Sequence, residues 1–209
     1  MLLDYASVIK QFNVNVTGII HVGGHIGEEL KTYKKHNVSN LIVFEPQKPC
    51  FDILKKEADS LEFENIQLVN KALGSDFGTV VMYCNVPDGL CSSVLKPKDV
   101  YQLDPNFDFS IREEVEMVTL DSVVGEDHNY NFLNMDTQGY ELQVLKGSSK
   151  TLEKIDYVYT EVNNAELYEG CPMVQDLDEY LGGFNFVRVK IGWGHPTWGD
   201  AFYIKEHLI

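Results

Sequence analysis

Two short segments of this sequence carry the residue types of a nucleotide-type binding site. Residues 21–29 read HVGGHIGEE, and Glu45 stands about twenty residues after the glycines. Glycines at the end of a strand let a ligand approach the backbone, and a following helix N-terminus favours a carboxylate or phosphate. A carboxylate at the end of the next strand can accept hydrogen bonds from two ribose hydroxyls. A tight strand-to-helix turn and a solvated acid before Pro46 would give the same pattern, so both interpretations stay open.

The glycine segment does not complete either familiar motif. GxGxxG would require glycine at position 22, where the chain has Val22. GxGxG would require glycine at position 25, where it has His25. The glycine segment therefore indicates a nucleotide-type site only in combination with Glu45.

Three more polar side chains follow apolar segments later in the chain. They are Asp136, Glu161 and Asn163. At the carboxyl ends of parallel strands, all three would lie on one edge of the sheet, with Asp136 facing the reactive end of a bound cofactor. Asp136 could instead cap the helix that follows Gly139.

The segments between these residues alternate between strand and helix patterns. Expected strands cover 18–24, 41–46, 65–73, 131–136 and 155–162, and expected helices cover 5–12, 28–36, 48–60, 140–153 and 174–181. This alternation predicts an α/β fold with a mostly parallel sheet and helices on both faces.

The last two expected strands, 184–190 and 201–205, are joined only by IGWGHPTWGD. A parallel crossover needs about 12 residues or more, so these strands must pair as an antiparallel hairpin. That ending is typical of class I methyltransferases, whereas a nicotinamide dehydrogenase would continue in parallel. Trp193 and Trp198 with His195 could form a stacking wall for a sugar ring, or a packed hairpin loop.

A chain of 209 residues predicts one domain, 1–209. Its middle departs from the alternation: residues 79–85 and 114–120 look like strands around a polar, proline-containing stretch. We expect residues 79–115 to be a substrate-side insertion. Ser92 and Ser93 within it could face the pocket or form a turn.

The formal charge of -15 excludes a strongly basic surface. Such a chain repels phosphate backbones and anionic membranes, so we expect neither nucleic acid nor a membrane as partner. The four cysteines have no metal-ligand spacing, and no apolar run approaches ~18 residues. We therefore expect a cytoplasmic protein; the residues indicate no oligomeric state.

Several of these blocks resemble FkbM-type S-adenosylmethionine (SAM)-dependent methyltransferases, a class I group that methylates hydroxyl groups. The resemblance spans residues 18–205 and rests on HVGGHIGEE, LIVFEP, NKALGS, VTLDSV, NMDTQGYELQVLKGS, TEVNNAELYEG and WGDAFYI. The family usually has Asp where His21 stands, often Glu where Gln138 stands, and commonly Ala at Gly24.

The resemblance implies a class I methyltransferase (Rossmann-like) fold, SAM as cosubstrate, and methyl transfer to a hydroxyl of a small molecule or sugar. It implies a cofactor site made of His21, Gly23, Gly24, His25, Gly27, Glu28, Glu45, Pro46, Lys71, Ala72 and Asp136. The first candidate base for the hydroxyl proton is Asp136, followed by Glu161 and His195.

Three alternatives stay open beside this prediction. No dedicated metal site is expected, but Asp136, Glu161 and Asn163 could hold one hard divalent cation that orients the hydroxyl. The chain could also be a non-catalytic cofactor-binding module with the same fold. A nicotinamide-dependent dehydrogenase is the third alternative.

Overall fold

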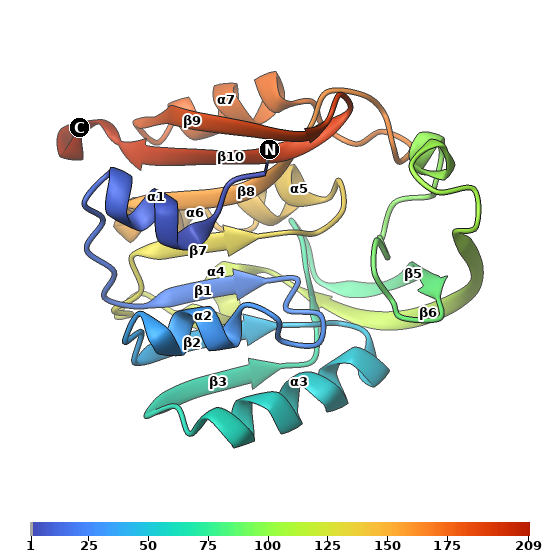
Figure 1. Cartoon of the computed structure of the whole chain (residues 1–209), viewed down its shortest axis with the longest axis horizontal. Helices are drawn as coiled ribbons and strands as arrows, with labels where there is room; N and C mark the ends of the chain where they lie inside the picture. The colour runs from blue at the N-terminus through green and yellow to red at the C-terminus, as the bar shows by residue number, and fades with distance from the viewer. Residues whose placement is uncertain (1) are drawn as a thin grey trace.

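Seven strands form the central sheet of the computed structural model, which describes residues 2–209 (Figure 1). Their order is β3-β2-β1-β7-β8-β10-β9. The strands are β1 (Ile19–Val22), β2 (Asn40–Phe44), β3 (Asn65–Val69), β7 (Phe132–Met135), β8 (Tyr157–Asn163), β9 (Phe186–His195) and β10 (Trp198–Lys205). Strand β10 is antiparallel to both β8 and β9, and the other pairs are parallel. The predicted mostly parallel sheet with a reversed C-terminal strand is confirmed.

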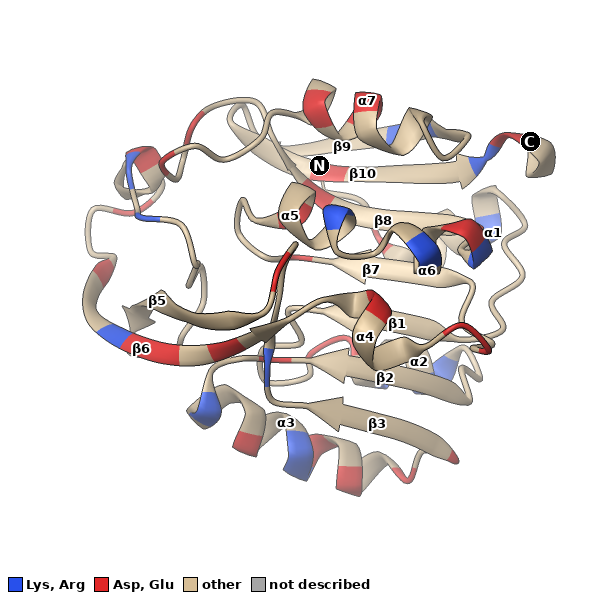
Figure 2. Ribbon diagram, turned by 180° about the vertical axis from the view of Figure 1, so that it is seen from behind, with Lys and Arg blue, Asp and Glu red and all other residues tan. Residues whose placement is uncertain are grey.

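Helices cover both faces of this sheet (Figures 1 and 2). One layer contains α1 (Tyr5–Gln11), α2 (Leu30–Lys35) and α3 (Lys48–Leu61). The opposite layer contains α4 (Leu120–Val124), α5 (Glu141–Lys146), α6 (Ser149–Lys154) and α7 (Val174–Gly182). Two short 3-10 helices, η1 (Asp99–Gln102) and η2 (Glu206–Leu208), complete the helical segments. The predicted helices on both faces are therefore present.

Strand alternation decides which side chains reach each layer. In β1, Ile19 packs in the α1–α3 layer, whereas Ile20 and Val22 pack in the α4–α7 layer. His21 lies between them in the strand and contacts Tyr33 of α2. Both faces of β1 are thus buried, which explains why three of its four residues are apolar.

A second, three-stranded sheet is formed by β4 (Ala72–Leu73), β5 (Gly78–Val86) and β6 (Asp108–Val118), in the order β4-β6-β5. The β5–β6 ribbon lies beyond the ends toward which the arrows of β1 and β2 point (Figure 1). Acidic residues are spaced along β6 (Figure 2). The ribbon therefore stands at the carboxyl edge of the large sheet.

Residues 65–73 form two strands in different sheets, where the sequence predicted one. The chain leaves β3 at Asn70, whose Nδ2 donates to the carbonyls of Glu45 and Pro46 at 2.8 and 2.9 Å. These hydrogen bonds turn the chain from β3 toward β4. They also hold the segment that follows β2.

Two glycine-containing segments also differ from the prediction. The expected helix 140–153 is divided into α5 and α6 at Gly147, which passes the Gly74 carbonyl oxygen so closely that a Cβ would lie 2.0 Å from it. The expected loop 191–200 is mostly strand, and its turn contains only Pro196 and Thr197. A Cβ at Gly199 would lie 2.3 Å from the Gly192 carbonyl oxygen. These glycines serve close backbone approach.

Among residues 2–209, no helix combines the length and the apolar character needed to cross a lipid bilayer.

Candidate functional site

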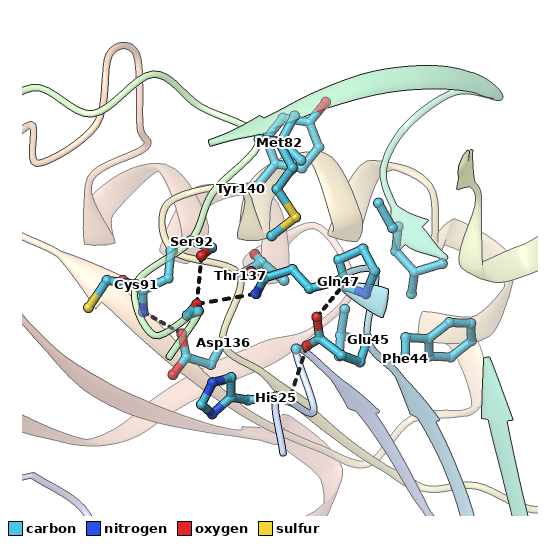
Figure 3. A pocket seen from close by; sticks show the side chains of 18 of the residues that line it. His25, Phe44, Glu45, Gln47, Met82, Cys91, Ser92, Asp136, Thr137 and Tyr140 are labelled. Atoms are coloured by element: carbon cyan, nitrogen blue, oxygen red, sulfur yellow. Dashed lines mark hydrogen bonds between the residues drawn. The ribbon is translucent and has the colours of Figure 1, made fainter. Parts of the chain in front are cut away.

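A cavity open to solvent lies where β1, β2 and β7 end (Figure 3). Residues 89–92 of the chain segment after β5 line its other side. The predicted site residues in the lining are Gly23, His25, Glu45, Pro46, Lys71, Ala72 and Asp136. The fold therefore brings both ends of the predicted cofactor site together.

The glycine turn after β1 fits against its neighbours only without side chains. Gly23 N and Gly24 N both donate to the Phe44 carbonyl oxygen, at 3.0 and 2.9 Å. Gly23 has φ +86°, and a Cβ there would lie 1.8 Å from the Asp136 carbonyl oxygen. Because only glycine tolerates this conformation and this contact, the turn packs tightly between the ends of β2 and β7.

Glu45 is a buried carboxylate held by the backbone. Its Oε2 accepts from His25 N at 2.8 Å, and its Oε1 accepts from Gln47 N at 2.7 Å (Figure 3). Burial raises the pKa of Glu45 to about 7, although both backbone hydrogen bonds oppose that shift. Each carboxylate oxygen can accept a second hydrogen bond, so the orientation leaves capacity for ligand hydroxyls.

His25 connects the glycine turn to the segment after β5. Its Nδ1 lies 3.0 Å from Glu28 Oε1, and its Nε2 lies 2.8 Å from the Asp88 carbonyl oxygen. The side-chain hydrogen bond with Cys50, followed by those with Asp88 and Glu28, raises the pKa of His25 to about 10. His25 is therefore a cation at neutral pH with protein partners at both ring nitrogens.

Gln138 links the two acids at the other end of the site. Its Nε2 donates to Asp136 Oδ1 at 2.6 Å and to Glu161 Oε2 at 2.8 Å. Glu161 is buried, whereas Asp136 is surrounded by protein but open to solvent through the cavity. Burial raises the pKa of both carboxyls, and the neighbouring charge of Asp136 raises that of Glu161 further.

Glu141 is a third acid here, and the sequence analysis missed it. Its Oε1 accepts from Thr137 N at 2.9 Å and from Gly139 N at 3.2 Å, immediately before α5. Asp136 makes no capping hydrogen bond to α5, so the alternative that Asp136 caps this helix is wrong. Burial raises the pKa of Glu141 to about 7. An acid in the first turn of a helix was the available signal.

Six of the predicted residues lie outside the cavity lining: His21, Gly24, Gly27, Glu28, Glu161 and His195. Strand alternation turns His21 toward α2, where its Nδ1 lies 3.3 Å from Tyr33 Oη. Burial lowers the pKa of His21 to about 4, so this side chain is neutral. Glu161 reaches the site through Gln138, as described above.

His195 lies at the hairpin between β9 and β10, where its Nδ1 is 2.7 Å from Thr197 Oγ1. Trp193 and His195 line a separate surface hollow with Pro196. Trp198 packs against the apolar cluster that contains Tyr168. The two tryptophans therefore do not share one wall at the cavity. Ser92 lines the cavity, and Ser93 Oγ donates to the Gln138 carbonyl oxygen at 2.8 Å.

A mostly parallel sheet with a reversed β10 is the fold of solved class I methyltransferases, and the family match makes this chain a SAM-dependent methyltransferase. The chain belongs to the FkbM methyltransferase family, whose domain matches residues 21–188. It is similar to a protein named 2-O-methyltransferase NoeI from Sinorhizobium fredii (strain NBRC 101917 / NGR234). The identity is 26% over 181 residues, which covers 81% of this chain and 72% of that protein.

Solved methyltransferases share the fold at low sequence identity. Magnesium protoporphyrin IX methyltransferase (ChlM) from Synechocystis PCC 6803 with bound SAM has a TM-score of 0.55 at 8% identity, over 96% of this chain and 77% of that one. Sp1610 of Streptococcus pneumoniae, a putative tRNA (m1A22) methyltransferase in complex with SAM, has a TM-score of 0.57 at 11% identity, over 98% and 73%. The family match supports a methyltransferase and gives no support to the alternative of a nicotinamide-dependent dehydrogenase.

Proposed function

We propose that this protein transfers a methyl group from SAM to a hydroxyl group of a sugar or another small molecule. One observation carries this proposal: a single cavity joins Glu45, after β2, to Asp136, after β7. The first carboxylate suits the hydroxyls of a ribose, and the second suits an acceptor hydroxyl. The similarity to a protein named 2-O-methyltransferase supports a hydroxyl acceptor.

The cavity offers each part of SAM a chemically suitable surface. Glu45 would accept hydrogen bonds from the ribose hydroxyls, because its carboxylate is already oriented by two backbone N–H groups. Phe44, Leu73 and Met82 line the same cavity and suit an adenine ring. Lys71, Ala72 and Pro46 would complete this end, and Gly23, which lines the cavity, would contact the methionine part.

SAM supplies a methyl group that is already activated on a sulfonium. The protein must therefore hold the acceptor oxygen in line with the methyl carbon and remove its proton. As the oxygen–carbon bond forms and the carbon–sulfur bond breaks, the hydroxyl proton would pass to Asp136. The raised pKa of Asp136 makes this carboxylate a stronger base than an ordinary aspartate. Glu161 would support Asp136 through the shared Gln138 amide.

The surroundings of the site favour a neutral acceptor. The chain carries a formal charge of -15, and three acids stand near the proposed reaction point. A carbohydrate carries no charge that this field would repel.

We propose that residues 1–209 act as one methyltransferase domain, in which residues 79–115 shape the acceptor side. The four cysteines of the described chain are free thiols, which supports a cytoplasmic location.

Calorimetric titration with S-adenosylhomocysteine (SAH), the product of the methyl donor, tests the cofactor site. We expect SAH to bind the protein and to bind Glu45→Ala much more weakly. Transfer of a labelled methyl group to a panel of monosaccharides and oligosaccharides then tests the acceptor class. Absence of SAH binding would refute the cofactor site, and labelling only of amines or carboxylates would refute the acceptor class.

A further inference from the structure

Three carboxylates from separate elements meet at one end of the site. Asp136 follows β7, Glu141 begins α5, and Glu161 lies in β8. One oxygen of each lies within 4.8 Å of the others. None of the three takes part in the ion pairs found within residues 2–209. The fold thus gathers negative charge without a protein cation beside it.

One of these carboxylates, and an amide two residues from another, have buried polar atoms without hydrogen-bond partners. Glu141 is only 1% exposed, and its Oε2 has no partner within the described chain. The same is true of Asn163, which is 1% exposed and whose Oδ1 and Nδ2 are both unpartnered there. Asn163 follows Glu161 by two residues in β8, so both side chains leave the sheet on the same face. Buried polar atoms without partners are rare in folded proteins, and a bound ion or water would satisfy them.

We propose that Asp136, Glu141 and Glu161, with Asn163 Oδ1, bind one hard divalent cation such as Mg²⁺ or Mn²⁺. Carboxylate and amide oxygens are the ligands that such ions prefer. Oxygens on opposite sides of one Mg²⁺ lie about 4.2 Å apart, and about 4.8 Å apart for Ca²⁺. The observed spread of up to 4.8 Å therefore needs only a small inward movement for the smaller ion.

Gln138 is compatible with this cation site. Its amide uses one oxygen of Asp136 and one of Glu161, namely Oδ1 and Oε2. The ion would use the second oxygen of each carboxylate. Gln138 Oε1 lies 3.0 Å from Tyr168 Oη, which has a single proton to donate and also lies 2.7 Å from the Cys91 carbonyl oxygen. The amide would thus align the two carboxylates toward the ion.

The role of the ion rests on the proposed function. Asp136 lines the cavity, so a cation bound there would lie at the end where the acceptor hydroxyl approaches. A divalent cation lowers the pKa of a hydroxyl that it binds and fixes its position.

To test the site, the chelator-treated protein is titrated with Mn²⁺, and the free ion is measured by electron paramagnetic resonance. We expect one tightly bound Mn²⁺ per chain. Glu141→Gln and Glu161→Gln should each weaken binding about tenfold or more, because each removes a ligand charge. Glu114→Gln makes the same change on the exposed face of β6 and should leave binding unchanged. Ca²⁺ and Mg²⁺ should displace Mn²⁺ from the wild-type protein.

Glu141→Gln retains an Oε1 for Thr137 and Gly139, so it should fold, and thermal melts with SAH titration check this for every variant. Equal Mn²⁺ affinity in wild type, Glu141→Gln and Glu161→Gln would overturn the inference. So would the absence of Mn²⁺ binding at millimolar concentration. If SAH binds while Mn²⁺ does not, only the cation site fails. If Mn²⁺ binds while SAH does not, the proposed function fails and the cation site stands.

Discussion

Replacement of Glu45 by glutamine should remove the pH dependence of SAH binding near neutrality. Burial raises the pKa of Glu45 to about 7 in the ligand-free protein, so the side chain is partly protonated there. Ribose hydroxyls donate to the ionised carboxylate, so binding favours the charged form and releases a proton when Glu45 is neutral. Affinity must therefore rise with pH through this range.

The size of this effect follows from the pKa. With a value of about 7, Glu45 is about one-tenth ionised at pH 6 and about nine-tenths ionised at pH 8. The wild-type association constant should therefore rise about tenfold between these pH values, or ~1.4 kcal/mol. His25 has a pKa of about 10 and stays charged across this range, so it contributes no titration. Glu141 titrates in the same range, but Glu45→Gln retains it.

Calorimetry at pH 6, 7 and 8 measures the SAH affinity of wild type and of Glu45→Gln under the same conditions. Glu45→Gln should bind weakly and with nearly constant affinity. Its melting temperature at each pH controls for loss of folded protein. A tenfold pH dependence that persists in Glu45→Gln, or a wild-type affinity that falls as pH rises, would refute this account of Glu45.

Three further predictions concern the turn, the base and the core. Gly23→Ala should cost about 2–4 kcal/mol of unfolding free energy, as measured by urea unfolding, because of its φ of +86° and the Asp136 contact. The control Gly182→Ala, with open space around it, should be neutral or slightly stabilising. Equal urea midpoints for Gly23→Ala and Gly182→Ala would contradict this prediction. Asp136→Asn should lower kcat by about 10²–10⁴ with SAH affinity retained, as measured by labelled methyl transfer; an unchanged kcat would exclude Asp136 as the base. The pKa of His21 is lowered to about 4, so its stabilising effect is complete above pH 6.5 and is lost as pH falls toward 4. The excess unfolding free energy of wild type over His21→Gln should therefore shrink by about 2 kcal/mol from pH 8 to pH 5. Unfolding free energies of the two proteins that change in parallel with pH would contradict this.

The sheet could be predicted because its strands are short apolar runs at regular intervals. The reversed C-terminal strand followed from a connection too short for a parallel crossover. What could not be predicted were contacts between distant backbones. Gly147, where the expected helix is divided, packs against the Gly74 carbonyl, and the turn at Asn70 depends on the carbonyls of Glu45 and Pro46. A local pattern carries no information about such partners.

The site could be predicted to the extent that strand ends determine it. Glu45 and Asp136 line one cavity because both directly follow parallel strands. Gln138 and Glu141 were missed because their roles depend on side-chain direction after the strand, not on its end. His21 shows the converse limit, because strand alternation places its side chain against α2 and outside the cavity lining.

The small sheet has a structural consequence for how relatives of this chain can diverge. The chain enters the sheet through β4 and leaves it through β6, and these strands pair directly, Leu73 beside Val118. The sheet also has a hydrophobic core of its own, which includes Met82 and Val115. A segment whose two ends meet can change length or be exchanged as a cassette at little entropic cost. Exchange of the β5–β6 ribbon between relatives would thus change the residues that cover the cavity, whereas the residues at the ends of β1, β2 and β7 would stay the same.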